Sequence, residues 1–219
     1  MVTKAEWFRR SSWTSVDETD FMARLKRSCT VFHKAQYLRI QALHLVQDAD
    51  PPLHEAALGL LDLLLRDYPD RSQVAAAHEQ RARSLDALGR GVDALDELRL
   101  AMEAERAHPG MQGHAYLEFA ELVLTLGRKD LFSGALAVLG GRRSAEIFPV
   151  VRYRKSAAAA FLCDELGLHG ESRAHATDAL VAAAKTASPF RYRRSLGLVK
   201  TSDADVVQGR LRRLAGKSA

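Results

Sequence analysis

The side chains that could bind a metal are scattered along this chain. None of the eight histidines has His-Glu-x-x-His spacing, and Cys29 and Cys163 form no Cys-x-x-Cys pair. His108 and His114 flank the Pro109-Gly110 turn, and a metal there would need ligands from other parts of the chain. The alternative is that both are ordinary loop histidines. We therefore expect no metal and no cofactor.

Patterns typical of catalysis are also missing from the sequence. It contains no glycine-rich phosphate loop and no Gly-x-Ser-x-Gly elbow. Cys163 lies in the apolar stretch 157–166, which favours a packed cysteine over a nucleophile. The acidic pairs Glu103/Glu105 and Asp164/Glu165 have spacings typical of solvated helix faces. The sequence thus predicts that the protein is not an enzyme.

Composition favours a helical protein. The 219 residues are 47% hydrophobic, with much Ala and Leu and only six Pro, a balance that suits one domain or one repeat array. No apolar run approaches the ~20 residues that span a bilayer. The first residues contain no continuous apolar stretch typical of a signal peptide. With two distant cysteines, these features predict a cytoplasmic protein without a membrane partner.

Positive charge is concentrated at the C-terminal end. Residues 189–219 hold eight Lys/Arg and two acids, a net +6, so the rest of the chain carries −1 of the total +5. A basic end can contact nucleic acid or an acidic partner. The other interpretation, which we favour, is a solvated helical end.

Three similar phrases indicate an internal repeat. Each is an apolar run that ends on Leu-Gly, at Gly89, Gly127 and Gly167, spaced 38 and 40 residues apart. Stepping back 37 residues from Gly89 leads to Pro52, in the turn 48–52. We expect the helix pairs to end near Pro69, Pro109, Gly140-Gly141 and Pro189.

The residues after each turn predict the packed face of a second helix. They lie five, nine and twelve positions beyond the turn residue, a spacing that puts them on one side of a helix. They are Ala57, Leu61, Leu64, Ala94, Leu98, Ala101, Phe132, Leu136, Leu139, Ser172, Ala176 and Ala179.

This pattern over residues 35–188 resembles the tetratricopeptide repeat superfamily, although the units are long and lack most of the aromatic signature of the first helix. Trp7-Phe8-Arg9 and the Leu196-Gly197-Leu198-Val199 close also resemble the ends of bacterial proteins of this type. The resemblance implies an all-α solenoid of about four antiparallel helix pairs. We divide the chain into an aromatic cap and helix (1–34), the repeats (35–188) and a basic segment with a short helix (189–219).

The flanking segments predict capping elements. Thr14 followed by Asp17 indicates a helix start, with Phe21, Leu25 and Cys29 on one stripe of residues 16–29. Trp7, Phe8 and Trp13 are expected to cover the first repeat, with an aromatic ligand platform as the alternative. A final helix is expected over 206–214, with inward residues Val207, Leu211 and Leu214.

The resemblance further implies a concave face lined by the first helix of each pair. Counted on this chain, a groove for another protein would include Arg39, Glu79, Arg83, Asp86, His114, Leu117, Glu121, Arg154, Phe161 and Asp164. Of these, Leu117 and Phe161 are expected to be exposed apolar contacts for a bound peptide or helix. The alternative is that the face is merely solvated.

The architecture therefore predicts a non-catalytic protein–protein interaction module, an adaptor or scaffold. A second hypothesis is an immunity or antitoxin-like inhibitor of a partner toxin. A third is weak nucleic-acid binding through residues 189–219, whose hallmark would be a steep loss of affinity with added salt.

Overall fold

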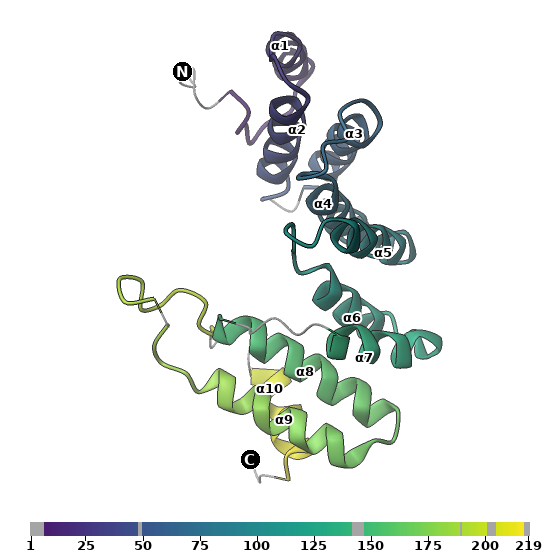
Figure 1. Cartoon of the computed structure of the whole chain (residues 1–219), viewed down its shortest axis with the longest axis vertical. Coiled ribbons are helices and arrows are strands. Elements are labelled where there is room, and N and C mark those ends of the chain that lie inside the picture. The colour runs from purple at the N-terminus through teal and green to yellow at the C-terminus, as the bar shows by residue number, and fades with distance from the viewer. Residues whose placement is uncertain (1–6, 48–49, 142–146, 189, 201–204, 217–219) are drawn as a thin grey trace. The chain divides into compact units, whose positions relative to one another are not determined.

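The computed structural model describes residues 7–47, 50–141, 147–188, 190–200 and 205–216. Within these ranges the regular structure is helical throughout and includes no strand, which confirms the predicted all-α class. The chain divides into two compact units, residues 1–115 (unit 1) and 116–219 (unit 2). Figure 1 shows the helices along the chain.

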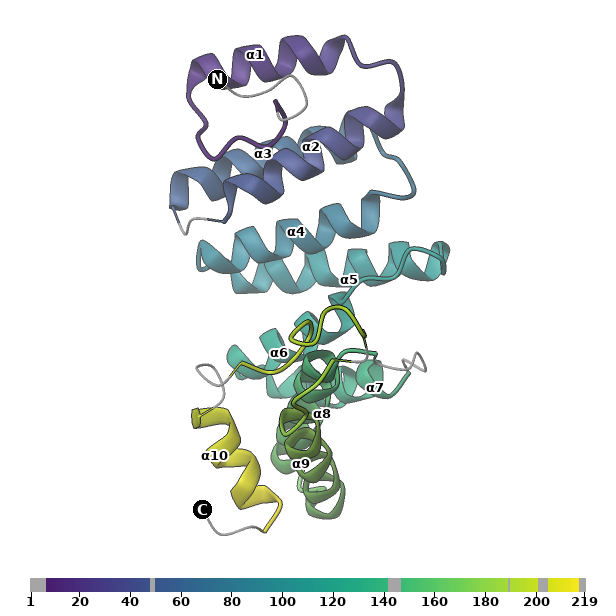
Figure 2. The ribbon, with the colours of Figure 1, turned by 90° about the vertical axis from the view of Figure 1, so that its left-hand side faces the viewer.

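Unit 1 contains helices α1 (Ser15–Lys26), α2 (Val31–Leu45), α3 (Pro51–Asp67), α4 (Val74–Ala87) and α5 (Gly91–Ala107). From α2 onward, each helix packs against the next one in sequence, as Figure 2 shows. Its core contains fully buried apolar side chains from α1, α2 and α3. They include Phe21, Leu38, Leu45, Leu61 and Leu64.

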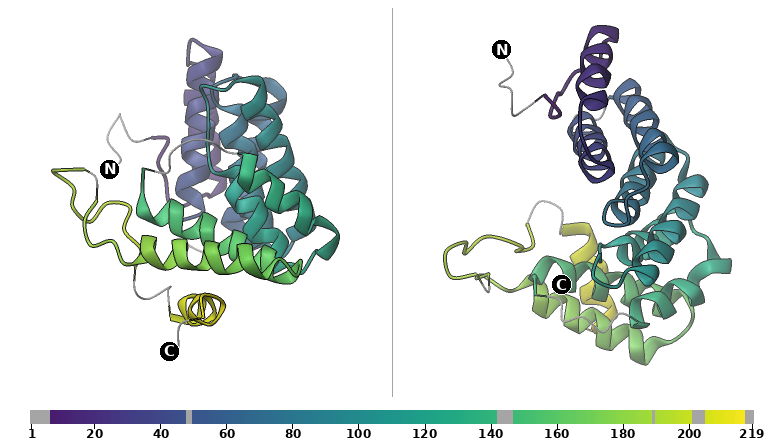
Figure 3. Two further views of the ribbon diagram at one scale, coloured as in Figure 1. Left: turned by 60° about the horizontal axis from the view of Figure 1, so that its bottom comes forward. Right: turned by 45° about the horizontal axis from the view of Figure 1, so that its top comes forward.

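Unit 2 holds α6 (Ala115–Thr125, whose first residue belongs to unit 1), the 3₁₀ helix η1 (Lys129–Leu131), α7 (Phe132–Gly141), α8 (Pro149–Glu165), α9 (His169–Ala183) and α10 (Asp205–Leu214). Helix α8 packs against α7 and against α9, and Figures 1 and 3 show α8 and α9 side by side. Helix α10 packs against both α8 and α9. Small side chains such as Ala160 and Ala176 allow α8 and α9 to approach closely.

Three Leu-Gly turns have the same backbone geometry. Gly89, Gly127 and Gly167 have φ of 76°, 63° and 76°, a left-handed conformation that glycine adopts without steric cost. After Gly89, the Arg90 N–H donates to the Leu85 carbonyl at 2.8 Å, and the Gly89 N–H donates to the Asp86 carbonyl at 2.9 Å. Equivalent pairs of bonds close the turns at Gly127 and Gly167. This is the Schellman ending, so each predicted helix stop is confirmed.

The second-helix positions expected from the repeat are confirmed as core positions. All are buried except the half-buried Leu136. Ser172 also donates its hydroxyl to the carbonyl of Ala160 at 3.0 Å, which ties α9 to α8. The spacing therefore identified the faces on which these helices pack.

Some helix boundaries differ from the prediction. Pro51 and Pro52 occupy the first turn of α3, where the missing N–H of proline costs no hydrogen bond. The third helix pair ends at Gly140-Gly141 as predicted, but both glycines are still helical, as the last residues of α7. Helix α1 ends at Lys26, so Cys29 is exposed and does not belong to the buried stripe of Phe21 and Leu25. Pro189, Asp203 and residues 48–49 lie outside the described residues.

The N-terminal aromatic residues pack against the core of unit 1, as expected for a cap. The Trp7 ring lies 5.1 Å from that of Phe21 and 5.0 Å from that of Tyr37, measured between centroids. Trp13 meets Phe21 edge-on at 5.4 Å. These ring contacts are those of a cap packed on the core, although Trp7, Phe8 and Trp13 remain half-buried.

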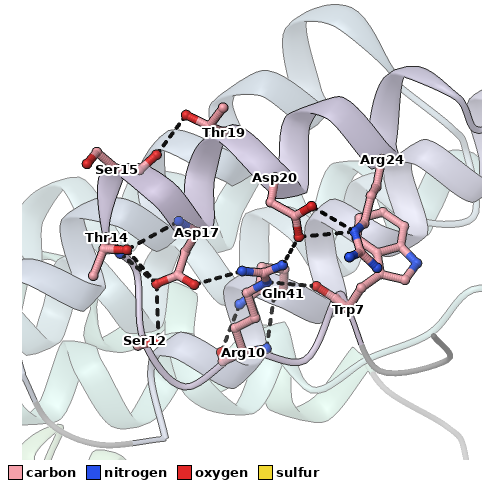
Figure 4. A network of polar contacts seen from close by, with 10 residues as sticks. All are labelled: Trp7, Arg10, Ser12, Thr14, Ser15, Asp17, Thr19, Asp20, Arg24 and Gln41. Carbon is pink, nitrogen blue, oxygen red and sulfur yellow. Dashed lines mark hydrogen bonds and ion pairs between the residues drawn. The ribbon is translucent and has the colours of Figure 1, made fainter. Parts of the chain in front are cut away.

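Arg10 fastens this cap to the helices, as Figure 4 shows. Its backbone N–H donates to the Gln41 side-chain oxygen at 3.0 Å, and the Gln41 amide donates back to its carbonyl at 2.8 Å. Its guanidinium forms ion pairs with Asp17 and Asp20. Asp17 also completes the predicted capping box with Thr14. Hydrogen bonds to the Asp17 carboxyl, first of all from the Thr14 backbone N–H and also from the Thr14, Arg10 and Ser12 side chains, lower its pKa to about 2.

Candidate functional site

The ten predicted groove residues fall in both units. Unit 1 holds Arg39, Glu79, Arg83, Asp86 and His114, and unit 2 holds Leu117, Glu121, Arg154, Phe161 and Asp164. The two sets are therefore described separately.

In unit 1, three of the predicted residues, Glu79, Arg83 and His114, belong to a polar network around the buried Glu79. Glu79 is buried on α4, accepts a hydrogen bond from the His114 N–H at 3.2 Å and forms an ion pair with Arg83. Glu105, also buried, accepts from the Gly113 N–H at 2.7 Å. These carboxylates hold the segment that leads into α6, so Glu79 has a structural role.

Arg39 extends the polar network toward α2. Its Nε donates to the Gln73 side-chain oxygen at 2.6 Å. Burial lowers the pKa of Arg39, and the negative charge of Glu79 opposes that shift. Asp86, in contrast, is exposed. Unit 1 thus uses most of its predicted groove residues to stabilise itself.

The prediction that Glu105 lies on a solvated helix face is wrong. Its spacing from Glu103 predicted a solvated pair, but only Glu103 is exposed. No local pattern distinguishes the two acids, because the partner of Glu105 is a backbone N–H eight residues further along the chain. Gly113 is favourable there, since a Cβ at this position would meet the Glu79 carboxylate.

In unit 2, a cavity of about 680 Å³ lies between α6, α8, residues 198–200 and α10. Most of its lining is apolar. The lining residues are Glu121, Leu124, Thr125, Val150, Tyr153, Arg154, Ala157, Ala158, Phe161, Leu198, Val199, Lys200 and Val207. Three predicted groove residues, Glu121, Arg154 and Phe161, are thereby brought together.

Charge in the cavity wall is largely paired. The Arg154 Nε donates to Glu121 at 2.8 Å, and a second guanidinium nitrogen contacts the other carboxylate oxygen. This two-pronged contact raises the pKa of Arg154. Burial raises the pKa of Tyr153, whose hydroxyl finds no hydrogen-bond partner among the described residues. The site therefore offers a mostly apolar surface with one neutralised ion pair and with Lys200 at its wall.

The prediction that Leu117 is an exposed contact is wrong. Leu117 is fully buried and belongs to the core. Leu124 lies two turns further along the same face of α6 and lines the cavity of unit 2, so position on that face does not by itself decide which residue is buried.

Phe161 and Asp164 are already in contact with the C-terminal helix. The Arg210 guanidinium lies over the Phe161 ring, 4.4 Å from its centroid. It also pairs with Asp164 at 3.2 Å and with Glu165 at 3.4 Å. Part of the predicted groove is thus covered by α10, with the predicted inward residue Leu211 fully buried. Val207 and Leu214 pack against the same cluster.

Two further findings concern the described part of the chain. No three His, Cys, Asp or Glu side chains there gather in a way that could hold a metal ion. None of its helices is both long and apolar enough to cross a membrane.

Comparison with known proteins gives no family assignment: no protein-family model and no curated protein matches this sequence.

Proposed function

We propose that this chain is a non-catalytic, cytoplasmic protein-interaction module of tetratricopeptide-like helix pairs, acting as an adaptor or scaffold. The pairs would be α2/α3, α4/α5, α6/α7 and α8/α9, stacked as a solenoid. The repeated Schellman turns at Gly89, Gly127 and Gly167 support this assignment. So does the packing of consecutive helices within each unit.

The observation that carries the proposal is the apolar cavity of unit 2. Its volume of about 680 Å³ is large enough for bulky apolar side chains, which typically supply most of the binding energy at protein interfaces. Leu124, Tyr153 and Phe161 would contact those side chains, and Arg154 would present polar atoms at the wall. Three of the lining residues also occupy positions that the repeat pattern assigns to a binding face.

A capture experiment with a matched pair of variants tests the proposal. Leu124→Asp places a charge on the cavity wall, so we expect at least a tenfold loss of specifically captured protein from a lysate of the native host. Leu126→Asp makes the same change on an exposed residue outside the cavity and should capture as the wild type does. Quantitative mass spectrometry measures the difference. Equal capture by both variants would contradict the proposal that the cavity binds a partner protein.

The two other hypotheses make different predictions. An immunity-like inhibitor would bind one toxin with high affinity, and its gene would lie beside the toxin gene. Nucleic-acid binding would use residues 189–219, but Arg210 is engaged by Asp164 and Glu165. We therefore favour the adaptor proposal over the immunity-like inhibitor and over nucleic-acid binding.

A further inference from the structure

The C-terminal helix α10 lies on the part of α8 that the repeat pattern assigns to partner binding. It contacts α8 and α9 and adds Val207 to the lining of the cavity. Its buried residue, Leu211, joins a cluster with Tyr153, Ala157 and Ala160 of α8. The helix α10 thus covers a surface of α8 that could also bind a helix of another protein.

The contact combines an apolar stripe with one arginine. Val207, Leu211 and Leu214 recur at the spacing of one helix face, whereas Val206 is 89% exposed. Arg210 lies between the first two stripe residues and meets Phe161, Asp164 and Glu165. An arginine over an aromatic ring and between two carboxylates is held by cation–π attraction and by charge. The surface is therefore complementary to a basic amphipathic helix.

The connection between α9 and α10 is not helical over its described residues, and the Val150 N–H of α8 donates to its Gly197 carbonyl at 2.8 Å. Between the end of α9 at Ala183 and the start of α10 at Asp205, the described residues 184–188 and 190–200 form turns and irregular structure. Tyr192 in this connection is 90% exposed. A helix held through such a connection competes with a free ligand at an effective concentration on the order of millimolar.

We propose that this surface, formed by Phe161, Asp164 and Glu165 and by the apolar face of α8 that contacts Leu211, is a docking site for a basic amphipathic helix of a partner protein, and that α10 occupies it in the same chain until that helix displaces it. The partner helix would carry an apolar stripe like that of α10 and an arginine equivalent to Arg210. The inference rests on the proposed function and deepens it by naming the chemistry of the partner.

The test uses the full chain and a fluorescein-labelled peptide of residues 203–219, followed by fluorescence anisotropy. The double variant Arg210→Glu/Leu211→Asp removes the contacts that hold α10 in place. We expect it to bind the peptide at least tenfold more tightly than the wild type does. Val206→Asp, on the exposed side of α10, should behave as the wild type. A peptide carrying Leu211→Asp should not bind either protein.

Circular dichroism verifies that the double variant stays folded. If it does not, Arg210→Ala is the milder substitute, and we expect a smaller increase in peptide affinity. Equal peptide affinity for wild type and variant, or no binding to either, would overturn the proposal. So would exchange of α10 between two copies, seen as a dimer by size-exclusion chromatography. Peptide binding can fail while Leu124→Asp still abolishes capture, so failure of this inference is distinguishable from failure of the proposed function.

Discussion

Replacing Phe21 by alanine should lower the free energy of unfolding of unit 1 by about 3–5 kcal/mol. Phe21 is fully buried, and its ring contacts both Trp7 and Trp13. Removing the ring leaves a cavity between the N-terminal cap and the core, and it deprives two large rings of their packing partner. Unit 1 should therefore unfold at a clearly lower urea concentration.

Tryptophan fluorescence during urea denaturation measures this effect selectively. The chain has only two tryptophans, Trp7 and Trp13, and both belong to the cap of unit 1. Val16→Ala is the control, because Val16 is 76% exposed and should change stability by less than about 0.5 kcal/mol. A Phe21→Ala midpoint equal to that of the control would contradict the cap assignment.

Replacing Glu79 by alanine should destabilise unit 1 by about 2–3 kcal/mol. The variant leaves the His114 N–H without its acceptor and removes the negative charge that offsets the burial of Arg39. We expect less than the ~3–5 kcal/mol typical of a broken, fully buried pair, because the ion-pair partner of Glu79, Arg83, is exposed.

The same denaturation measurement applies, with Asp86→Ala as the control. Asp86 lies on the same helix but is exposed, so its loss should change stability by less than about 0.5 kcal/mol. Equal stabilities of the two variants would show that the polar network around Glu79 contributes little.

Local features of the fold could be predicted from the sequence. The ends of α4, α6 and α8 depend on a glycine and its immediate neighbours, so each Leu-Gly phrase identified its turn. The start of α1 depends only on Thr14 and Asp17, three residues apart. The buried faces of α3, α5 and α9 followed from helical spacing.

Features that depend on distant parts of the chain could not be predicted. The burial of Leu117 depends on which elements cover α6, and helical spacing alone does not define them. Arg210 pairs with Asp164, 46 residues earlier, so the tail's positive charge could only be read as solvated or as ligand-binding. The cavity forms where α6 and α8 meet residues 198–200 and α10. The repeat pattern predicted three of its lining residues, Glu121, Arg154 and Phe161. It did not predict that Leu198, Val199 and Val207 would close the cavity.

The central claim is that the cavity of unit 2 contacts a partner protein. A photo-crosslinking amino acid at position 124, incorporated in native host cells, tests it most directly, with position 92 in unit 1 as the control because Val92 is exposed and does not line the cavity. We predict a discrete protein adduct from position 124 that position 92 does not give. No adduct from position 124, or the same adducts from both positions, would contradict the claim.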